Sequence, residues 1–239
     1  MTGERNNLSS AFEKSEKLKY LNAWDFSNRA YADYSPGLEL SNSLNFLDLF
    51  KHNGVRTILD AGCGSGKLLK KMLDMGFQCK GIDIADNCLD PELKPLQEKI
   101  LKTAPLWRKE TFEERQFDAV ICTDVLEHIH PQYVEEVLQN IYHWANKYVF
   151  LQIALFEDYF GQKIKQRLHL TVRPKKWWDG QLQKFEYKVL ACSKNDKGEE
   201  CYAIYLLEKI NRADRLSLSD KQLVMTEKQN RTHLSNMTK

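Results

Sequence analysis

Apolar runs of strand length alternate with helical stretches along most of the chain. Short apolar runs predict strands near residues 56–60, 77–82, 117–122, 147–153, 186–192 and 201–208, and a weaker run predicts another near 100–104. Helical spacing predicts helices near residues 40–50, 91–101, 131–145 and 174–184, and one more between Gly66 and Gly76. This alternation indicates an α/β fold with a doubly wound, mostly parallel seven-stranded sheet. The polar stretch Asn195–Glu199 predicts a hairpin loop that makes the last two strands an antiparallel edge.

The two ends of the chain differ from the middle. Residues 1–20 are polar with a weak helical pattern, and residues 211–239 have no aromatic residue and six basic against three acidic side chains. Such segments bury little apolar surface, so we expect disorder or a loosely docked helix, with a partner-binding arm as the alternative. We therefore divide the chain into an N-terminal polar segment with an aromatic lid (1–39), one folded domain (40–210) and a polar tail (211–239).

Composition limits the class of protein. A chain of 239 residues with 42% hydrophobic side chains can form one well-buried domain with small additions. The longest apolar run, Tyr148–Phe156, is interrupted by Gln152 and is too short for a membrane helix of about 20 residues, and the N-terminus lacks a secretion-signal core. We expect a cytoplasmic protein without a membrane partner. Six cysteines without a C-x-x-C pair predict reduced thiols rather than a zinc site.

Three glycines at alternate positions follow the first predicted strand. Asp60 ends the apolar run, and Gly62, Gly64 and Gly66 come before a helical pattern. Glycine leaves no Cβ between the backbone and a ligand, so this turn predicts a binding site. A phosphate-binding loop is excluded by Ala61 and Leu68, and a dinucleotide fingerprint would need its third glycine where Lys67 stands.

The motif Asp60-x-Gly62-x-Gly64-x-Gly66 resembles the nucleoside-binding turn of class I S-adenosylmethionine-dependent methyltransferases. Two further features match that family in order and spacing: Asp83 ends the next strand 21 positions after Gly62, and residues 117–129 resemble the fourth strand and its loop. The resemblance implies a Rossmann-like fold, methyltransferase activity in residues 40–210 and S-adenosylmethionine as cofactor.

The resemblance also assigns cofactor-binding roles. Asp60 and the three glycines would face the methionine part, Asp83 would hold the ribose, and Thr123 would pass close to the sulfonium. Where the family often has an acid for the adenine amine, this chain has Ala104. We therefore expect backbone groups, with Leu106 or Trp107 against the ring, to contact the adenine. Aromatic residues before the first helix resemble a lid, so Arg29, Tyr31 and Tyr34 are candidates to close the site.

Four polar residues are candidates for the chemistry. Asp124, Glu127 and His128 share one face if a helical turn follows the fourth strand, and His169 follows the fifth strand. The pattern resembles the ubiquinone-biosynthesis and small-RNA 3′-end O-methyltransferases, where such residues can gather a divalent ion. His128, His169 and Asp124 are thus catalytic candidates, and all four are candidate metal ligands. The alternative is that Glu127 and His128 make structural hydrogen bonds without a metal.

Basic side chains concentrate between Gly161 and Lys184. Seven of them stand against one acid, Asp179, in a chain with a net charge of +2. Together with Trp177 and Trp178 they predict a small or terminal anionic acceptor, such as a sugar, a nucleotide or a quinone precursor, methylated on oxygen. A solvated basic face is an equal alternative. Nucleic acid as acceptor is disfavoured by the nearly neutral chain, and a non-catalytic cofactor-binding subunit is a further alternative.

Overall fold

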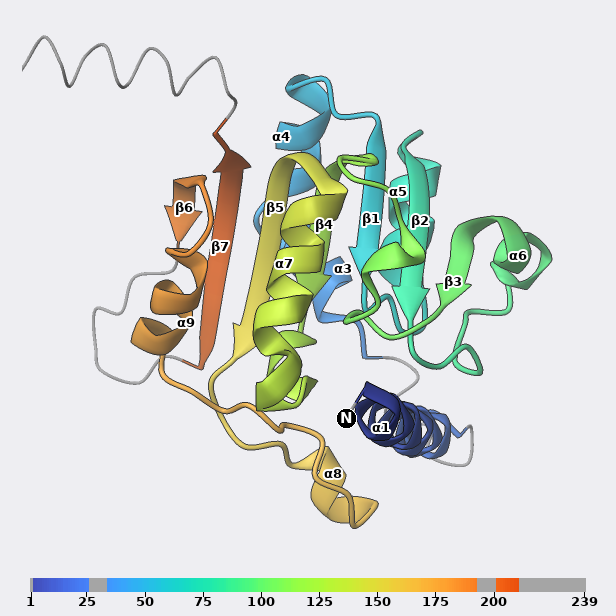
Figure 1. Ribbon diagram of the computed structural model, residues 1–239. Coiled ribbons are helices and arrows are strands. Elements are labelled where there is room, and N and C mark those ends of the chain that lie inside the picture. The colour runs from blue at the N-terminus through green and yellow to red at the C-terminus, as the bar shows by residue number, and fades with distance from the viewer. Residues whose placement is uncertain (1, 26–33, 193–200, 211–239) are drawn as a thin grey trace, which may run out of the picture.

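The sheet has seven strands in the order β3-β2-β1-β4-β5-β7-β6. The computed structural model describes residues 2–25, 34–192 and 201–210 (Figure 1). In chain order the strands are β1 Thr57–Ala61, β2 Gln78–Asp83, β3 Leu101–Thr103, β4 Phe117–Thr123, β5 Ala145–Ala154, β6 Tyr187–Cys192 and β7 Tyr202–Lys209. β7 runs antiparallel to β5 and β6, whereas β1 to β5 pair in parallel. The predicted fold class is confirmed, and the predicted loop Asn195–Glu199 lies outside the described residues.

Helices connect the strands and also precede them. They are α1 Thr2–Ala23, α3 Pro36–Ser43, α4 Phe46–His52, α5 Lys67–Asp74, α6 Gln97–Ile100, α7 Val134–Trp144, α8 Phe160–Lys163 and α9 Lys175–Leu182. The helix predicted at 40–50 is two helices, because Asn45 between them adopts a left-handed conformation with φ 50°. The helix predicted at 91–101 is shorter: a 3-10 turn that contains Pro95 comes first, and only α6 is α-helical. Within the described ranges, no helix is both long and apolar enough to cross a bilayer.

Adjacent residues of the central strands pack into two separate hydrophobic cores, one on each face of the sheet. Leu59, Val120 and Leu151 pack on the face that α7 and α9 cover, together with the fully buried Trp144 and Trp178. Ile58, Ile121 and Phe150 point to the opposite face, where α4 and α5 pack. Side chains alternate across a strand, so a continuous apolar run supplies both faces at once. Figure 1 shows α7 in front of the sheet and α4 and α5 behind it.

The glycine turn between β1 and α5 is bonded to the neighbouring strand. The N–H of Gly62 donates to the Ile82 carbonyl at 2.7 Å, and the N–H of Gly64 donates to Oδ2 of Asp83 at 2.9 Å. Gly62, Gly64 and Gly66 have φ values of 84°, 49° and 75°. A Cβ at Gly62 would lie 2.3 Å from Cγ2 of Val125, so this position needs glycine for space as well as for conformation.

A pair of alanine substitutions separates these two requirements. Gly76 has φ 88° and no atom within 4 Å of the place that a Cβ would occupy, so Gly76→Ala should cost only the conformational penalty of about 1–2 kcal/mol. Gly62→Ala should cost more, because overpacking against Val125 adds about 1–3 kcal/mol. Urea denaturation measures both. In a Val125→Ala background the cost of Gly62→Ala should fall toward that of Gly76→Ala, and an unchanged cost would contradict the steric explanation.

Candidate active site

Two small cavities open beside the glycine turn, where β1, β2 and β4 end. Cavity A has a volume of about 100 Å³ and cavity B of about 60 Å³. The residues singled out from the sequence that line cavity A are Gly62, Gly64, Asp83, Leu106, Trp107, Asp124 and His128. Those that line cavity B are Tyr34, Asp60, Gly62, Gly64, Thr123 and Asp124. Most of the predicted site residues therefore meet in one place, far apart as they are in the sequence.

Three of the predicted site residues line neither cavity. Gly66 caps α5, and a Cβ there would lie 2.8 Å from Cδ1 of Leu93, so its place is explained by packing. Glu127 is fully buried and accepts a hydrogen bond from the N–H of Ala154 at 2.9 Å. His169 stands behind His128, with ring centroids 4.6 Å apart and the rings nearly perpendicular. His169 lines a different hollow, on the side of residues 157–168.

Two carboxylates flank the glycine turn, one in each cavity. Asp83 accepts hydrogen bonds from the N–H of Gly64 and of Ala85. Burial raises the pKa of Asp83, and these N–H donors oppose that rise. Asp60 is 3% exposed, and burial, followed by the nearby charge of Asp83, raises its pKa to about 7. Asp60 is thus poised to ionise when a cation arrives beside it.

Asp124 faces both cavities in an unusual backbone conformation. Its φ is 59°, and its N–H donates to the Gln152 carbonyl at 2.9 Å. The Tyr34 hydroxyl hydrogen-bonds to the Asp124 carboxylate and to Tyr202; after burial, the charge of Asp124 is the largest cause that raises the pKa of Tyr34. Tyr202, at the start of β7, had no signal in the sequence that linked it to this site. Of the predicted lid residues, Tyr34 therefore reaches the site, and Arg29 and Tyr31 lie outside the described residues.

His128 is held between two polar groups. The loop after β4 forms a 3-10 turn, Leu126–His128, instead of the expected α-helical turn. The Nδ1 atom of His128 lies 3.0 Å from the Tyr20 hydroxyl, and the imidazole also contacts the Leu168 carbonyl. Burial, then the charges of His169 and Lys19, lower the pKa of His128 well below its usual value. This lowered pKa favours the neutral form of the imidazole.

The predicted metal quartet comes together only in part. Among the described residues, Glu127, His128 and His169 offer ligand atoms within 4.8 Å of one another, and Asp124 is not in that group. The 3-10 turn and the positive φ of Asp124 remove the shared helical face that would have joined all four. Both sides of the His128 ring are engaged, and burial and Asp124 raise the pKa of Glu127 well above normal, which favours its neutral form. The trio thus offers three ligand atoms without Asp124, and Oε2 of Glu127 is buried with no hydrogen-bond partner among the described residues.

Helix α1 covers cavity A. Its residues Glu16 and Tyr20, with Trp24 just beyond its end, line that cavity. The Phe12 ring packs on Trp107 with centroids 5.8 Å apart, and Glu13 pairs with Arg108 at 2.7 Å. Residues 1–20, for which disorder or a loosely docked helix was expected, belong to α1, and its described side chains contact Trp107 and Arg108. The inward face mixes charged side chains with Phe12 and Tyr20, so the sequence shows only a weak helical pattern there.

The indole of Trp24 stands between the two cavities. It contributes to the lining of both, and a Cβ at Gly64 would lie 3.1 Å from its Cζ2 atom. A side chain at this position would press on the indole, and the positive φ of Gly64 also favours glycine. The glycine turn is therefore covered by an aromatic side chain at the point where the two cavities would join.

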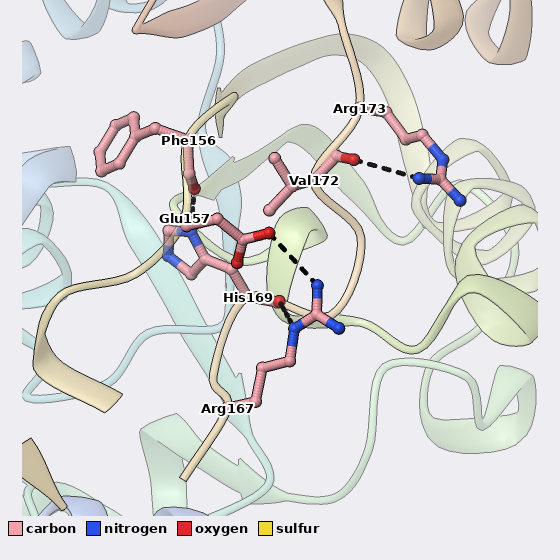
Figure 2. Close-up of polar contacts among 6 residues, drawn as sticks. All are labelled: Phe156, Glu157, Arg167, His169, Val172 and Arg173. Atoms are coloured by element: carbon pink, nitrogen blue, oxygen red, sulfur yellow. Dashed lines mark hydrogen bonds and ion pairs between the residues drawn. The ribbon is translucent and has the colours of Figure 1, made fainter. Parts of the chain in front are cut away.

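The basic residues after β5 do not form one surface. Figure 2 shows the Arg167 guanidinium between Glu157, at 3.3 Å, and the His169 carbonyl, whereas Arg173 turns to the carbonyl of Val172. Lys175 and Lys184 pair with Asp179 and Glu135, at 2.8 and 2.7 Å. The same figure shows Nδ1 of His169 against the Phe156 carbonyl, 2.7 Å away. Much of the predicted positive charge is thus neutralised within the chain.

Known proteins resemble this chain in sequence and in fold. A family model described as a methyltransferase domain matches residues 31–190, more than half of the chain. "Ubiquinone biosynthesis O-methyltransferase" of Burkholderia vietnamiensis is 30% identical over 115 residues, 44% of this chain and 50% of the relative. The protein of the same name from Rickettsia bellii is 35% identical over 88 residues, 35% of each chain. The chain thus matches half or less of the length of these curated relatives.

Solved structures share the fold at low sequence identity. The Burkholderia thailandensis 1,6-didemethyltoxoflavin-N1-methyltransferase, solved with S-adenosylhomocysteine, has a TM-score of 0.62 and 18% identity, over 84% of this chain and 90% of that one. The magnesium protoporphyrin IX methyltransferase of Synechocystis PCC 6803 has a TM-score of 0.60 and 16% identity, over 84% and 99%. With the family match over residues 31–190, these findings show that the chain belongs to the class I S-adenosylmethionine-dependent methyltransferases.

Proposed function

We propose that the protein transfers a methyl group from S-adenosylmethionine to an oxygen atom of a small hydroxylated acceptor. The observation that carries this proposal is the bare glycine turn, which faces cavities A and B and has Asp83 in one and Asp60 in the other. His128 and Asp124 face the same space. Methyl transfer to a hydroxyl needs a site that binds the cofactor and has polar groups beside it for the reacting hydroxyl, and this arrangement offers both.

The cofactor fits the groups that line the two cavities. Each oxygen of Asp83 accepts one backbone N–H, and a carboxylate offers about four lone-pair sites, so Asp83 can also accept both ribose hydroxyls. We assign the adenine to Leu106 and Trp107 in cavity A, and the methionine part to Asp60, Gly62, Gly64 and Thr123 in cavity B. The ammonium group of the cofactor would then favour the ionised form of Asp60.

The chemistry requires alignment more than covalent catalysis. The methyl carbon is already activated by the positive sulfur, so most of the acceleration can come from holding the acceptor oxygen in line with it. A hydroxyl must also lose its proton, and His128 and Asp124 are the groups beside cavity A that can help to remove it. His169 supports His128 from behind in this proposal. No step requires a metal.

Size and charge support a small acceptor. Helix α1 covers cavity A, which favours a small molecule over a nucleic-acid strand. The names of the relatives from Burkholderia vietnamiensis and Rickettsia bellii support oxygen as the methylated atom. Arg173 and Lys176 make no ion pair within the described part of the chain, so we assign them to an anionic group on the acceptor.

Asp83→Asn tests the cofactor assignment. The amide places an N–H₂ group against the backbone donors and removes a charged acceptor for the ribose, a loss of about 1.5–3 kcal/mol. The dissociation constant for S-adenosylmethionine, measured by calorimetry, should rise roughly tenfold to a hundredfold. The matched control is Asp74→Asn, an exposed carboxylate on α5 that pairs with Lys70. Equal affinities for both variants would refute the role of Asp83.

Transfer of labelled methyl groups tests the function itself. The protein is incubated with methyl-labelled S-adenosylmethionine and either the small-molecule fraction or the RNA fraction of a cell extract, with and without EDTA. We expect label in the small molecules, as alkali-stable methyl ethers, at an unchanged rate in EDTA. Label in RNA would overturn the acceptor class, and loss of activity in EDTA would overturn the metal-free mechanism. Cofactor binding without any transfer would favour a non-catalytic subunit.

A further inference from the structure

Asn140 is 1% exposed and lies among apolar side chains on the buried face of α7. Its side-chain amide donates a hydrogen bond to the carbonyl of Leu106, at 2.8 Å. Leu106 and the next residue, Trp107, line cavity A. Resting on the proposed function, in which these two residues bind the adenine, we propose that Asn140 is a positioning residue for the cofactor. It holds the peptide between Leu106 and Trp107 so that the N–H of Trp107 donates to a ring nitrogen of the adenine.

The amide of Asn140 occupies a position where an apolar side chain would pack well. Burial of an amide costs free energy unless the amide makes hydrogen bonds. The hydrogen bond of Asn140 joins α7 to a turn 34 positions earlier in the chain, so it fixes the turn as well as the helix. The other buried residues of α7 are apolar or aromatic: Val134, Val137, Leu138, Ile141 and Trp144.

Two further side chains beside Asn140 hold the same turn. Trp107 stacks on Tyr133, which comes just before α7, with ring centroids 4.9 Å apart and an angle of 15° between the rings. The Nε1 atom of Trp144 donates to the carbonyl of Lys109 at 3.2 Å. Tyr133, Asn140 and Trp144 follow one another at intervals of seven and four residues, the spacing that places side chains on one face of a helix. This face of α7 therefore sets the position of the turn.

The hydrogen bond of Asn140 also defines where the N–H of Trp107 points. The described peptide bonds are trans, and in a trans peptide the C=O and N–H groups point in opposite directions. Because the Leu106 carbonyl faces Asn140, the N–H of Trp107 points away from α7. This N–H has no hydrogen-bond partner within the described residues. It is a donor left for a ligand, and the ring nitrogens of adenine are acceptors.

Two measurements on the full-length protein with S-adenosylhomocysteine test this role: calorimetry, and hydrogen exchange at the Trp107 amide followed by NMR. In the wild type, binding should slow exchange at this amide about tenfold or more, because a hydrogen-bonded N–H exchanges only when the bond opens. Asn140→Leu should raise the dissociation constant roughly fivefold, as expected for the loss of one hydrogen bond. It should also abolish the protection of the Trp107 amide, which a merely structural role of Asn140 would leave in place.

Two control variants should keep both the affinity and the protection. Gln139→Leu makes the same change at the neighbouring, exposed amide of α7, and Val137→Ala weakens the buried face without removing the amide. If Asn140→Leu does not fold, the smaller Asn140→Ala takes its place. Binding to the wild type without protection of the Trp107 amide, or unchanged affinity and protection in the Asn140 variant, would overturn the proposal and leave the proposed function standing. A wild type that does not bind S-adenosylhomocysteine would overturn both.

Discussion

Hydrogen bonds between the glycine turn and the end of β2 hold the centre of this site. The N–H groups of Gly62 and Cys63 share the Ile82 carbonyl, and the N–H of Gly64 reaches the Asp83 carboxylate. These bonds join the ends of two parallel strands and leave the other side of the turn facing the two cavities and the Trp24 indole. The same carboxylate that fixes the turn also faces cavity A, so the support and the proposed binding group are one residue.

The fold follows from patterns that local physics determines. Continuous apolar runs predicted the strands because helices cover both faces of the sheet. The glycine spacing predicted the turn because side chains there would press on Val125 and Trp24. Asp60, Asp83 and Thr123 could be located in advance since each lies at or next to the end of a parallel strand. Strand ends meet at one edge of such a sheet whatever the details of its helices.

The parts that sequence reasoning missed depend on tertiary contacts. Periodicity could not show that Asn45 breaks a helix, or that Asp124 takes a left-handed conformation that separates it from the 3-10 turn of Glu127 and His128. The inward face of α1 escaped notice because Glu13, Glu16 and Lys19 look like solvent-facing residues. The partner of Glu13, Arg108, lies 95 positions away, and no local pattern contains that information. Tyr202 reaches the site from β7 for the same reason.

The position of Trp24 has a consequence for how binding can be observed. Its indole lines both cavities and lies against Gly64 at the end of α1. A ligand that occupies both cavities contacts this ring and changes its surroundings. The intrinsic tryptophan fluorescence of the protein would report that change without any added dye.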